Sequence, residues 1–110
     1  MGESMPYLFV NVWFPPQKSQ EMGKKALEVF QKFPEDSSIG KTIIQGALMR
    51  TKNGIKGITI TEVNEGKLEA AIDRAQELVD MYSEIEGVNA RFDLYATLAE
   101  SMEMIGLKLP

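Results

Sequence analysis

The first apolar run of the chain has the pattern of a β-strand that is covered on both faces. Residues 6–14, PYLFVNVWF, are rich in aromatic and β-branched residues and are bounded by prolines. Successive side chains of a strand point to opposite faces. One face carries Leu8, Val10, Val12 and Phe14, and the other carries Tyr7, Phe9 and Trp13. Asn11 is the polar residue of the second face, so both faces are predicted to be packed.

Two later segments repeat apolar residues with the period of an α-helix. The first ends near Lys32, and Pro34 stops it. Its apolar positions are Met22, Ala26, Val29, Phe30 and Phe33. The second begins after Asn64, which we expect to cap it, and runs to about Glu86 before Gly87. Its apolar positions are Leu68, Ala71, Ile72, Ala75, Val79 and Tyr82.

Residues 42–52 and 55–63 are predicted to be the two strands of a hairpin joined at Asn53-Gly54. Asn-Gly favours a two-residue turn because both turn positions require positive φ. Pairing across this turn divides the side chains between two faces. One face would carry Ala47, Met49, Ile58 and Ile60, which we expect to lie against the helices. The other face would carry Ile44, Leu48, Arg50, Thr59 and Thr61.

The C-terminal quarter of the chain predicts a last strand and a short helix. Residues 88–96, VNARFDLYA, alternate between apolar and polar side chains. Residues 97–100, TLAE, have the T-x-x-E form of a capping box, which opens a helix. Gly106 is expected to close this helix, and residues 107–110 form a tail.

The predicted order of elements is strand, helix, strand, strand, helix, strand and short helix. The order βαββαβ is that of the ferredoxin-like plait, an α+β fold with a four-stranded antiparallel sheet. A chain of 110 residues suits one domain, so residues 1–110 are predicted to form a single ferredoxin-like domain. Residues 1–5 are expected to be a flexible N-terminus.

In such a plait both helices cover the same side of the sheet. The aliphatic faces of the first and last strands are expected to lie against them. The opposite face would carry Tyr7, Phe9, Asn11, Trp13, Ile44, Leu48, Thr59, Thr61, Arg91, Asp93 and Tyr95. A face with so many aromatic residues normally meets a partner. It is therefore predicted to be the interface of a homodimer, the wall of a small-molecule pocket, or both.

The strand order, the length, the doubly apolar first strand and the short last helix resemble the dimeric α+β barrel superfamily. This superfamily includes cofactor-independent antibiotic-biosynthesis monooxygenases, muconolactone isomerases, haem-degrading monooxygenases and several uncharacterised families. The resemblance covers nearly the whole chain and implies a homodimer that meets through its sheet faces. The haem degraders have an asparagine on the first strand, where Asn11 stands, but this chain has no histidine to bind haem iron. The quinone-forming monooxygenases surround a phenolic substrate with the residue types of Asn11, Trp13, Arg91 and Tyr95.

The candidate ligand-binding residues are Asn11, Trp13, Thr59, Arg91 and Tyr95. Asp93 is the candidate general base, with Arg91 as an anchor for an anion, if a desolvated pocket surrounds them. Arg91 and Asp93 stand two positions apart on one face, so the alternative is that they simply pair with each other or across a two-fold axis. Trp13 likewise has the alternative role of an interface core residue.

The composition excludes several kinds of chemistry. The chain contains no cysteine, which rules out disulfides, thiolate catalysis and zinc–sulfur sites. It contains no histidine, which rules out Ser-His-Asp catalysis, histidine-bound haem and most transition-metal sites. We therefore expect no cofactor and no bound metal.

The charge and the apolar runs predict the compartment and exclude two classes of partner. A net charge of −4 and the lack of clustered Lys and Arg argue against nucleic-acid binding. No apolar run approaches the roughly 20 residues of a membrane-spanning helix. The beginning of the chain, MGESMP, lacks the apolar core of a signal peptide. We therefore expect a soluble, cytoplasmic protein without a membrane partner.

Residues 35–42, EDSSIGKT, end like a nucleotide-binding P-loop. A P-loop has the pattern G-x-x-x-x-G-K-[ST] between a strand and a helix. Here Glu35 occupies the first glycine position, a helix precedes, and a β-like run follows. The segment is predicted to be a polar loop with a turn glycine and no phosphate site.

The function predicted first is binding of a small semi-polar or aromatic molecule by a homodimer. The alternative is a cofactor-independent monooxygenase or isomerase of the dimeric α+β barrel type. A non-catalytic structural or interaction module is the third possibility.

Overall fold

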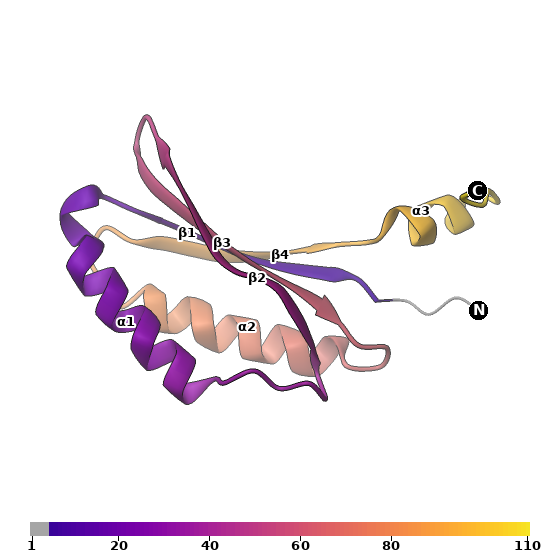
Figure 1. Ribbon diagram of the computed structural model, residues 1–110, viewed down its shortest axis with the longest axis horizontal. Coiled ribbons are helices and arrows are strands. Elements are labelled where there is room, and N and C mark those ends of the chain that lie inside the picture. The colour runs from indigo at the N-terminus through magenta and orange to yellow at the C-terminus, as the bar shows by residue number, and fades with distance from the viewer. Residues whose placement is uncertain (1–4) are drawn as a thin grey trace.

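The computed structural model describes residues 5–110, which form a four-stranded antiparallel sheet with two helices on one face (Figure 1). The elements are β1 (Tyr7–Phe14), a 3-10 turn (Pro16–Lys18), α1 (Ser19–Lys32), β2 (Gly40–Thr51), β3 (Gly54–Val63), α2 (Leu68–Tyr82), β4 (Asn89–Tyr95) and α3 (Leu98–Met104). The strand order is β2-β3-β1-β4. This arrangement confirms the predicted ferredoxin-like α+β fold. Of the segment predicted to be a flexible N-terminus, residues 1–4 lie outside the described residues.

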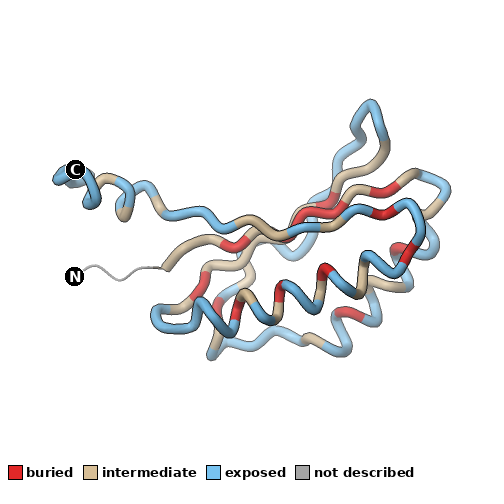
Figure 2. The backbone as a smooth tube through the Cα atoms, turned by 180° about the vertical axis from the view of Figure 1, so that it is seen from behind, coloured by how far each residue is buried: buried red, intermediate tan, exposed pale blue. Residues whose placement is uncertain are grey.

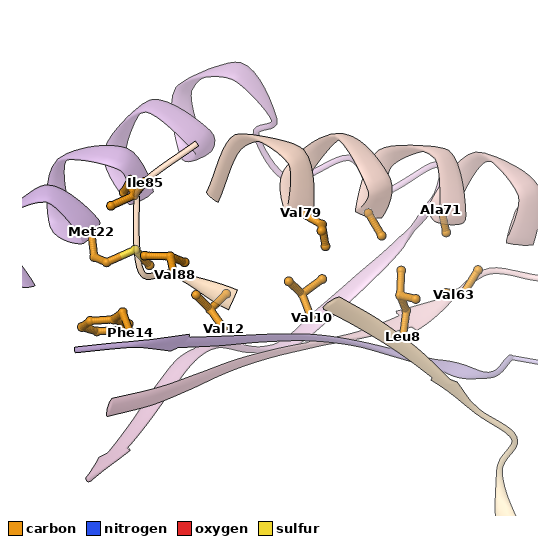
Figure 3. Close-up of a cluster of buried hydrophobic side chains, with 11 residues drawn as sticks. Leu8, Val10, Val12, Phe14, Met22, Val63, Ala71, Val79, Ile85 and Val88 are labelled. Carbon is orange, nitrogen blue, oxygen red and sulfur yellow. The ribbon is translucent and has the colours of Figure 1, made fainter. Parts of the chain in front are cut away.

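The hydrophobic core lies between the sheet and the two helices. Leu8, Val10, Val12 and Phe14 project from one face of β1 toward the helices (Figure 3). They pack with Met22, Val63, Ala71, Ala75, Val79, Ile85 and Val88. The predicted aliphatic face of β1 is therefore confirmed. In the described chain, α2 packs against β1 and β4, and α1 packs against α2.

The β2–β3 hairpin is confirmed, but its turn lies one residue earlier than predicted. Thr51 pairs with Gly54, so Lys52 and Asn53 form the tip. The Thr51 hydroxyl donates to the Gly54 carbonyl at 2.8 Å and accepts from the Asn53 amide at 3.2 Å. Gly54 has a φ of 136°, which side chains rarely allow. Leu48 consequently stands opposite Gly57. A turn centred on Asn53-Gly54 would instead give Leu48 a partner two residues further along β3.

The prediction of which hairpin face meets the helices was wrong. In the β1–β3 pairing, Val10 stands opposite Thr59, and Asn11 stands opposite Ile58. Directly paired residues share a face of the sheet. The helix side therefore holds Leu48, Thr59 and Thr61, and the open side holds Ala47, Met49, Ile58 and Ile60. The hairpin pattern separates these two groups, but only its pairing with β1 decides which group meets the helices.

Two register shifts in β2 place one further residue on the open side. The register of β2 against β3 shifts between Thr42 and Ala47. Ile44 pairs with Ile60 as a result, so it lies on the open side, where it was predicted.

The boundaries of α2 differ from the prediction at both ends. Lys67 is the N-cap residue. The predicted cap, Asn64, instead donates from its side chain to the Ser37 carbonyl at 2.9 Å. The helix ends at Tyr82, and Gly87 follows with a φ of 86°. None of the described helices is long and apolar enough to cross a membrane.

The segment that resembles the end of a P-loop belongs to the sheet. Gly40 opens β2 and pairs with Val63, and a Cβ atom at Gly40 would clash with the Glu62 carbonyl oxygen. The glycine is required by this close approach rather than by a turn. Just before it, hydrogen bonds from Ser38 hold the pKa of Asp36 below its usual value. A carboxylate kept ionised in this way disfavours a bound phosphate.

Candidate functional site

The open side of the sheet carries a polar cluster of three residues from β1 and β4. Asn11 Nδ2 donates to Asp93 Oδ2 at 2.9 Å, and Arg91 Nε donates to the same oxygen at 3.1 Å. Although it lies on the open side, Asn11 is only 5% exposed. Its buried amide is thus satisfied within the chain. The prediction that Arg91 and Asp93 pair with each other is confirmed.

Aromatic side chains surround this cluster. The Arg91 guanidinium lies 5.4 Å from the centre of the Trp13 ring, and the Lys56 ammonium lies 5.3 Å from it. Both are cation–π contacts. The Phe9 and Tyr95 rings have centroids 4.5 Å apart and an interplanar angle of 47°. Cations and aromatic rings are therefore held together across β3, β1 and β4.

Four of the five predicted ligand-binding residues come together on this open side. Asn11 pairs with Arg91 across the sheet, and Tyr95 pairs with Tyr7 on the same face. Trp13 completes the group through its contact with Arg91. Thr59 lies on the helix side instead, because it pairs with Val10. A ligand-binding role for these residues stays a prediction.

Removing the Asp93 carboxylate is expected to destabilise the protein. Asp93→Ala leaves the buried amide of Asn11 without its acceptor, a loss that costs about 1–3 kcal/mol. Asp93→Asn keeps one acceptor oxygen and is expected to cost less than about 1 kcal/mol. Urea unfolding of the two variants at equal protein concentration measures the difference. Equal losses for both variants would contradict this role of Asp93.

The helix side of the sheet contains a cavity of about 270 Å³. It lies between α1 on one side and the β2–β3 hairpin and β1 on the other. Its apolar lining comprises Val10, Val12, Phe14, Met22, Gly23, Ala26, Phe30, Gly46, Leu48, Ile55, Gly57 and Ile58. Phe30 of α1 was predicted to be buried but is exposed, because the hairpin does not close against this helix.

The polar groups of the cavity are few and uncharged. They belong to Ser19, Gln45, Thr59 and Tyr82. The Thr59 hydroxyl donates to the Gln45 carbonyl at 3.1 Å. Burial raises the pKa of Tyr82, so its hydroxyl remains neutral at neutral pH. The cavity therefore suits a neutral, mainly apolar molecule with one or two hydrogen-bonding groups.

The sequence analysis missed this cavity. Its existence depends on the distance between α1 and the hairpin, which no local pattern encodes. The available signal was the accumulation of small residues in facing elements, namely Gly23, Ala26, Gly46 and Gly57. In a strand or helix interior, a glycine weakens the element and often marks a close approach or a space.

Neither candidate site has an arrangement of metal ligands. Among residues 5–110, no group of three or more His, Cys, Asp or Glu side chains could hold a metal ion. The carboxylate of the polar cluster, Asp93, already accepts two hydrogen bonds. What the two sites offer is apolar contact, aromatic rings and hydrogen bonds.

The fold and these sites define a ferredoxin-like α+β protein with an open aromatic sheet face and an apolar cavity on its helix side. No protein-family model matches the chain, and no curated protein matches it. Among solved structures it is similar to "De novo designed protein Foldit4", with a TM-score of 0.51 and 11% identity. The match covers 86% of this chain and 97% of the designed one. At this identity the likeness shows the fold alone.

Proposed function

We propose that the protein binds a small, neutral, largely apolar molecule in the cavity between α1 and the hairpin. The observation that supports this function is the cavity itself, about 270 Å³ in volume and lined by residues without charge. An apolar cavity of about 150 Å³ is enough to hold benzene. A molecule of one or two fused rings therefore fits the available volume. The polar residues of the lining, Thr59 and Gln45 among them, would recognise one polar group on it.

The protein is further proposed to act as a homodimer that meets through the open side of the sheet. That side holds Trp13, Ile58, Ile60 and the Phe9–Tyr95 ring pair, and within residues 5–110 no helix covers it (Figure 1). Apolar faces of this kind normally meet a partner. A second copy is the partner that always offers the same face, in an isologous two-fold contact. The resemblance to dimeric α+β barrels supports the same arrangement.

Filling the cavity from α1 is expected to abolish ligand binding without unfolding the protein. Gly23 lines the cavity, and a Cβ atom built on it meets nothing within 4 Å. The side chain of Gly23→Leu would extend into the ligand volume, whereas Gly23→Ala leaves most of that volume open. Both substitutions favour the helix by up to about 1 kcal/mol, so neither is expected to weaken the fold.

The measurement is titration calorimetry with phenol, indole and 2-naphthol on wild type and both Gly23 variants. Binding is expected for wild type and Gly23→Ala, and a loss of at least about tenfold in affinity is expected for Gly23→Leu. A native mass spectrum of the protein as purified from cells shows in parallel whether a molecule is already bound. If Gly23→Leu binds the probes as tightly as wild type, the cavity is not the binding site.

The catalytic alternative receives no support from a specific observation. Asp93 Oδ2 accepts hydrogen bonds from Asn11 and Arg91, and its side chain lies on the side of the sheet opposite to the cavity. A base that serves a substrate in the cavity would have to lie on the other face. The monooxygenase or isomerase activity and the purely structural role therefore stay predictions from the sequence.

A further inference from the structure

The apolar cavity proposed to bind a ligand adjoins a second cavity of about 110 Å³, which we call the polar compartment. Both lie on the helix side of the sheet, and they share five lining residues: Val10, Phe30, Gln45, Thr59 and Tyr82. Because the same residues line both spaces, the two form one groove between the helices and the β2–β3 hairpin. β2, which borders this groove, is exposed over most of its length, so the groove is accessible from solvent (Figure 2).

Threonines of the sheet form one wall of the polar compartment. Thr42 and Thr61 line it beside Thr59, and they are directly paired across β2 and β3. The Cβ atoms of such a pair lie about 4.5–5.5 Å apart, so one small group can contact both residues. Within residues 5–110, the hydroxyls of Thr42 and Thr61 have no hydrogen-bond partner, and both residues are half-buried. These two hydroxyls are therefore available to a ligand.

The opposite wall of the polar compartment carries one cation and one anion. Arg74 of α2 and Glu35 of the loop between α1 and β2 both line it. The Arg74 side chain is held at two points: Nη2 donates to the Pro34 carbonyl, and the guanidinium lies 5.5 Å from the centre of the Phe33 ring. A guanidinium has five N–H donors, so donors remain for a ligand. The ionised carboxylate of Glu35 can only accept hydrogen bonds.

These opposite charges disfavour a ligand that is itself an ion. An anion attracted by Arg74 would also meet the carboxylates of Glu35 and Asp36, because the three residues line a further small cavity together. A cation attracted by the carboxylates would meet the Arg74 guanidinium. A neutral group that both donates and accepts hydrogen bonds can use the threonines, the guanidinium and the carboxylate alike. Hydroxyl groups have this property.

We propose that the ligand of this groove is an amphipathic molecule with an apolar ring system and a neutral tail that carries two neighbouring hydroxyl groups. The ring system occupies the apolar cavity. The tail passes Thr59 into the polar compartment, where it meets Thr42, Thr61 and Arg74. Polyol ethers of aromatic alcohols belong to this class. This inference rests on the proposed binding function and names the class of ligand.

Fluorescence anisotropy titrations with three naphthyl ethers test this inference. The first probe is 3-(2-naphthyloxy)propane-1,2-diol, the second is 2-propoxynaphthalene, which has the same chain without hydroxyls, and the third is the anion (2-naphthyloxy)acetate. Wild type is expected to bind the diol at least about fivefold more tightly than either other probe, as for one or two added hydrogen bonds. Equal affinities for the diol and 2-propoxynaphthalene, or tighter binding of the anion, would overturn the inference and leave the proposed function intact. If wild type binds none of the probes, the proposed function and the inference both fail.

Two double variants assign the preference for the diol to the polar compartment. Thr42→Val with Thr61→Val removes both hydroxyls at nearly constant size, and valine suits a strand, so the variant is expected to keep the circular dichroism spectrum of wild type. The ratio of its affinities for the diol and for 2-propoxynaphthalene is expected to fall to about one, because the hydrogen bonds to the tail are lost. The matched control, Thr42→Ser with Thr61→Ser, keeps both hydroxyls and is expected to keep the ratio of wild type. A wild-type ratio in the valine variant would mean that the diol is recognised elsewhere, and would overturn the inference.

Discussion

Introducing a charge on the open side, with Ile60→Asp, is expected to convert the proposed dimer into a folded monomer. Ile60 stands opposite Phe9 on β1 and opposite Ile44 on β2. In the single chain this side is open, so the new carboxylate can remain hydrated. Between two sheet faces it would be buried without a partner, which costs about 3–5 kcal/mol. Because about 1.4 kcal/mol is tenfold in affinity, association should weaken by more than about 100-fold.

Sedimentation velocity measures the mass, and Trp13 provides an optical signal. Trp13 is the single tryptophan of the chain and lies on the same open side. Its emission is expected to shift to longer wavelength as the dimer dissociates. The matched control is Leu27→Asp, which adds the same charge to an exposed position of α1 on the helix side. If Ile60→Asp keeps the mass of wild type, the open side is not the interface.

Replacing Leu8 with alanine is expected to cost about 3 kcal/mol of unfolding free energy, within the range of about 2–5 kcal/mol for buried leucines. Leu8 is 5% exposed and projects from β1 toward α2, where Ala71 lies above it (Figure 3). The loss combines the transfer of the missing carbon atoms with the space that they leave. Since domains have a total stability of about 5–15 kcal/mol, this one change removes a large share of it.

Guanidinium unfolding at a fixed protein concentration measures this loss. Leu27→Ala makes the same chemical change at a position that is 64% exposed on α1. It is expected to change the unfolding free energy by less than about 0.5 kcal/mol. Similar losses for the two variants would mean that Leu8 does not belong to the hydrophobic core.

Much of the fold could be predicted because its signals are local. The capping box at Thr97 and Glu100 depends on residues three positions apart, and it forms as predicted. The alternation of β1 likewise assigns Leu8 and Val10 to one face and Phe9 and Asn11 to the other without reference to the rest of the chain. The errors concerned the hairpin, whose turn and helix-facing side were misplaced, and the start of α2, where the predicted cap Asn64 contacts Ser37 instead.

The candidate site was predicted only in part, because it depends on pairing between distant strands. Asn11 and Asp93 are 82 positions apart, and their hydrogen bond requires the β1–β4 register. The alternation of each strand was enough to assign both to the open side once the fold was assumed. Thr59 was misplaced because the hairpin pattern is the same whichever face turns toward the helices.

The sequence by itself determined the order of the elements, the ferredoxin-like fold, the aliphatic core face of β1 and the absence of cysteine and histidine chemistry. These follow from periodicity, turn residues and composition, which act over a few positions. Only the tertiary structure decided which side Thr59 occupies, what satisfies the buried amide of Asn11, and that a cavity opens between α1 and the hairpin. Each of these depends on how elements far apart in the chain are placed against one another, and packing in three dimensions sets that placement.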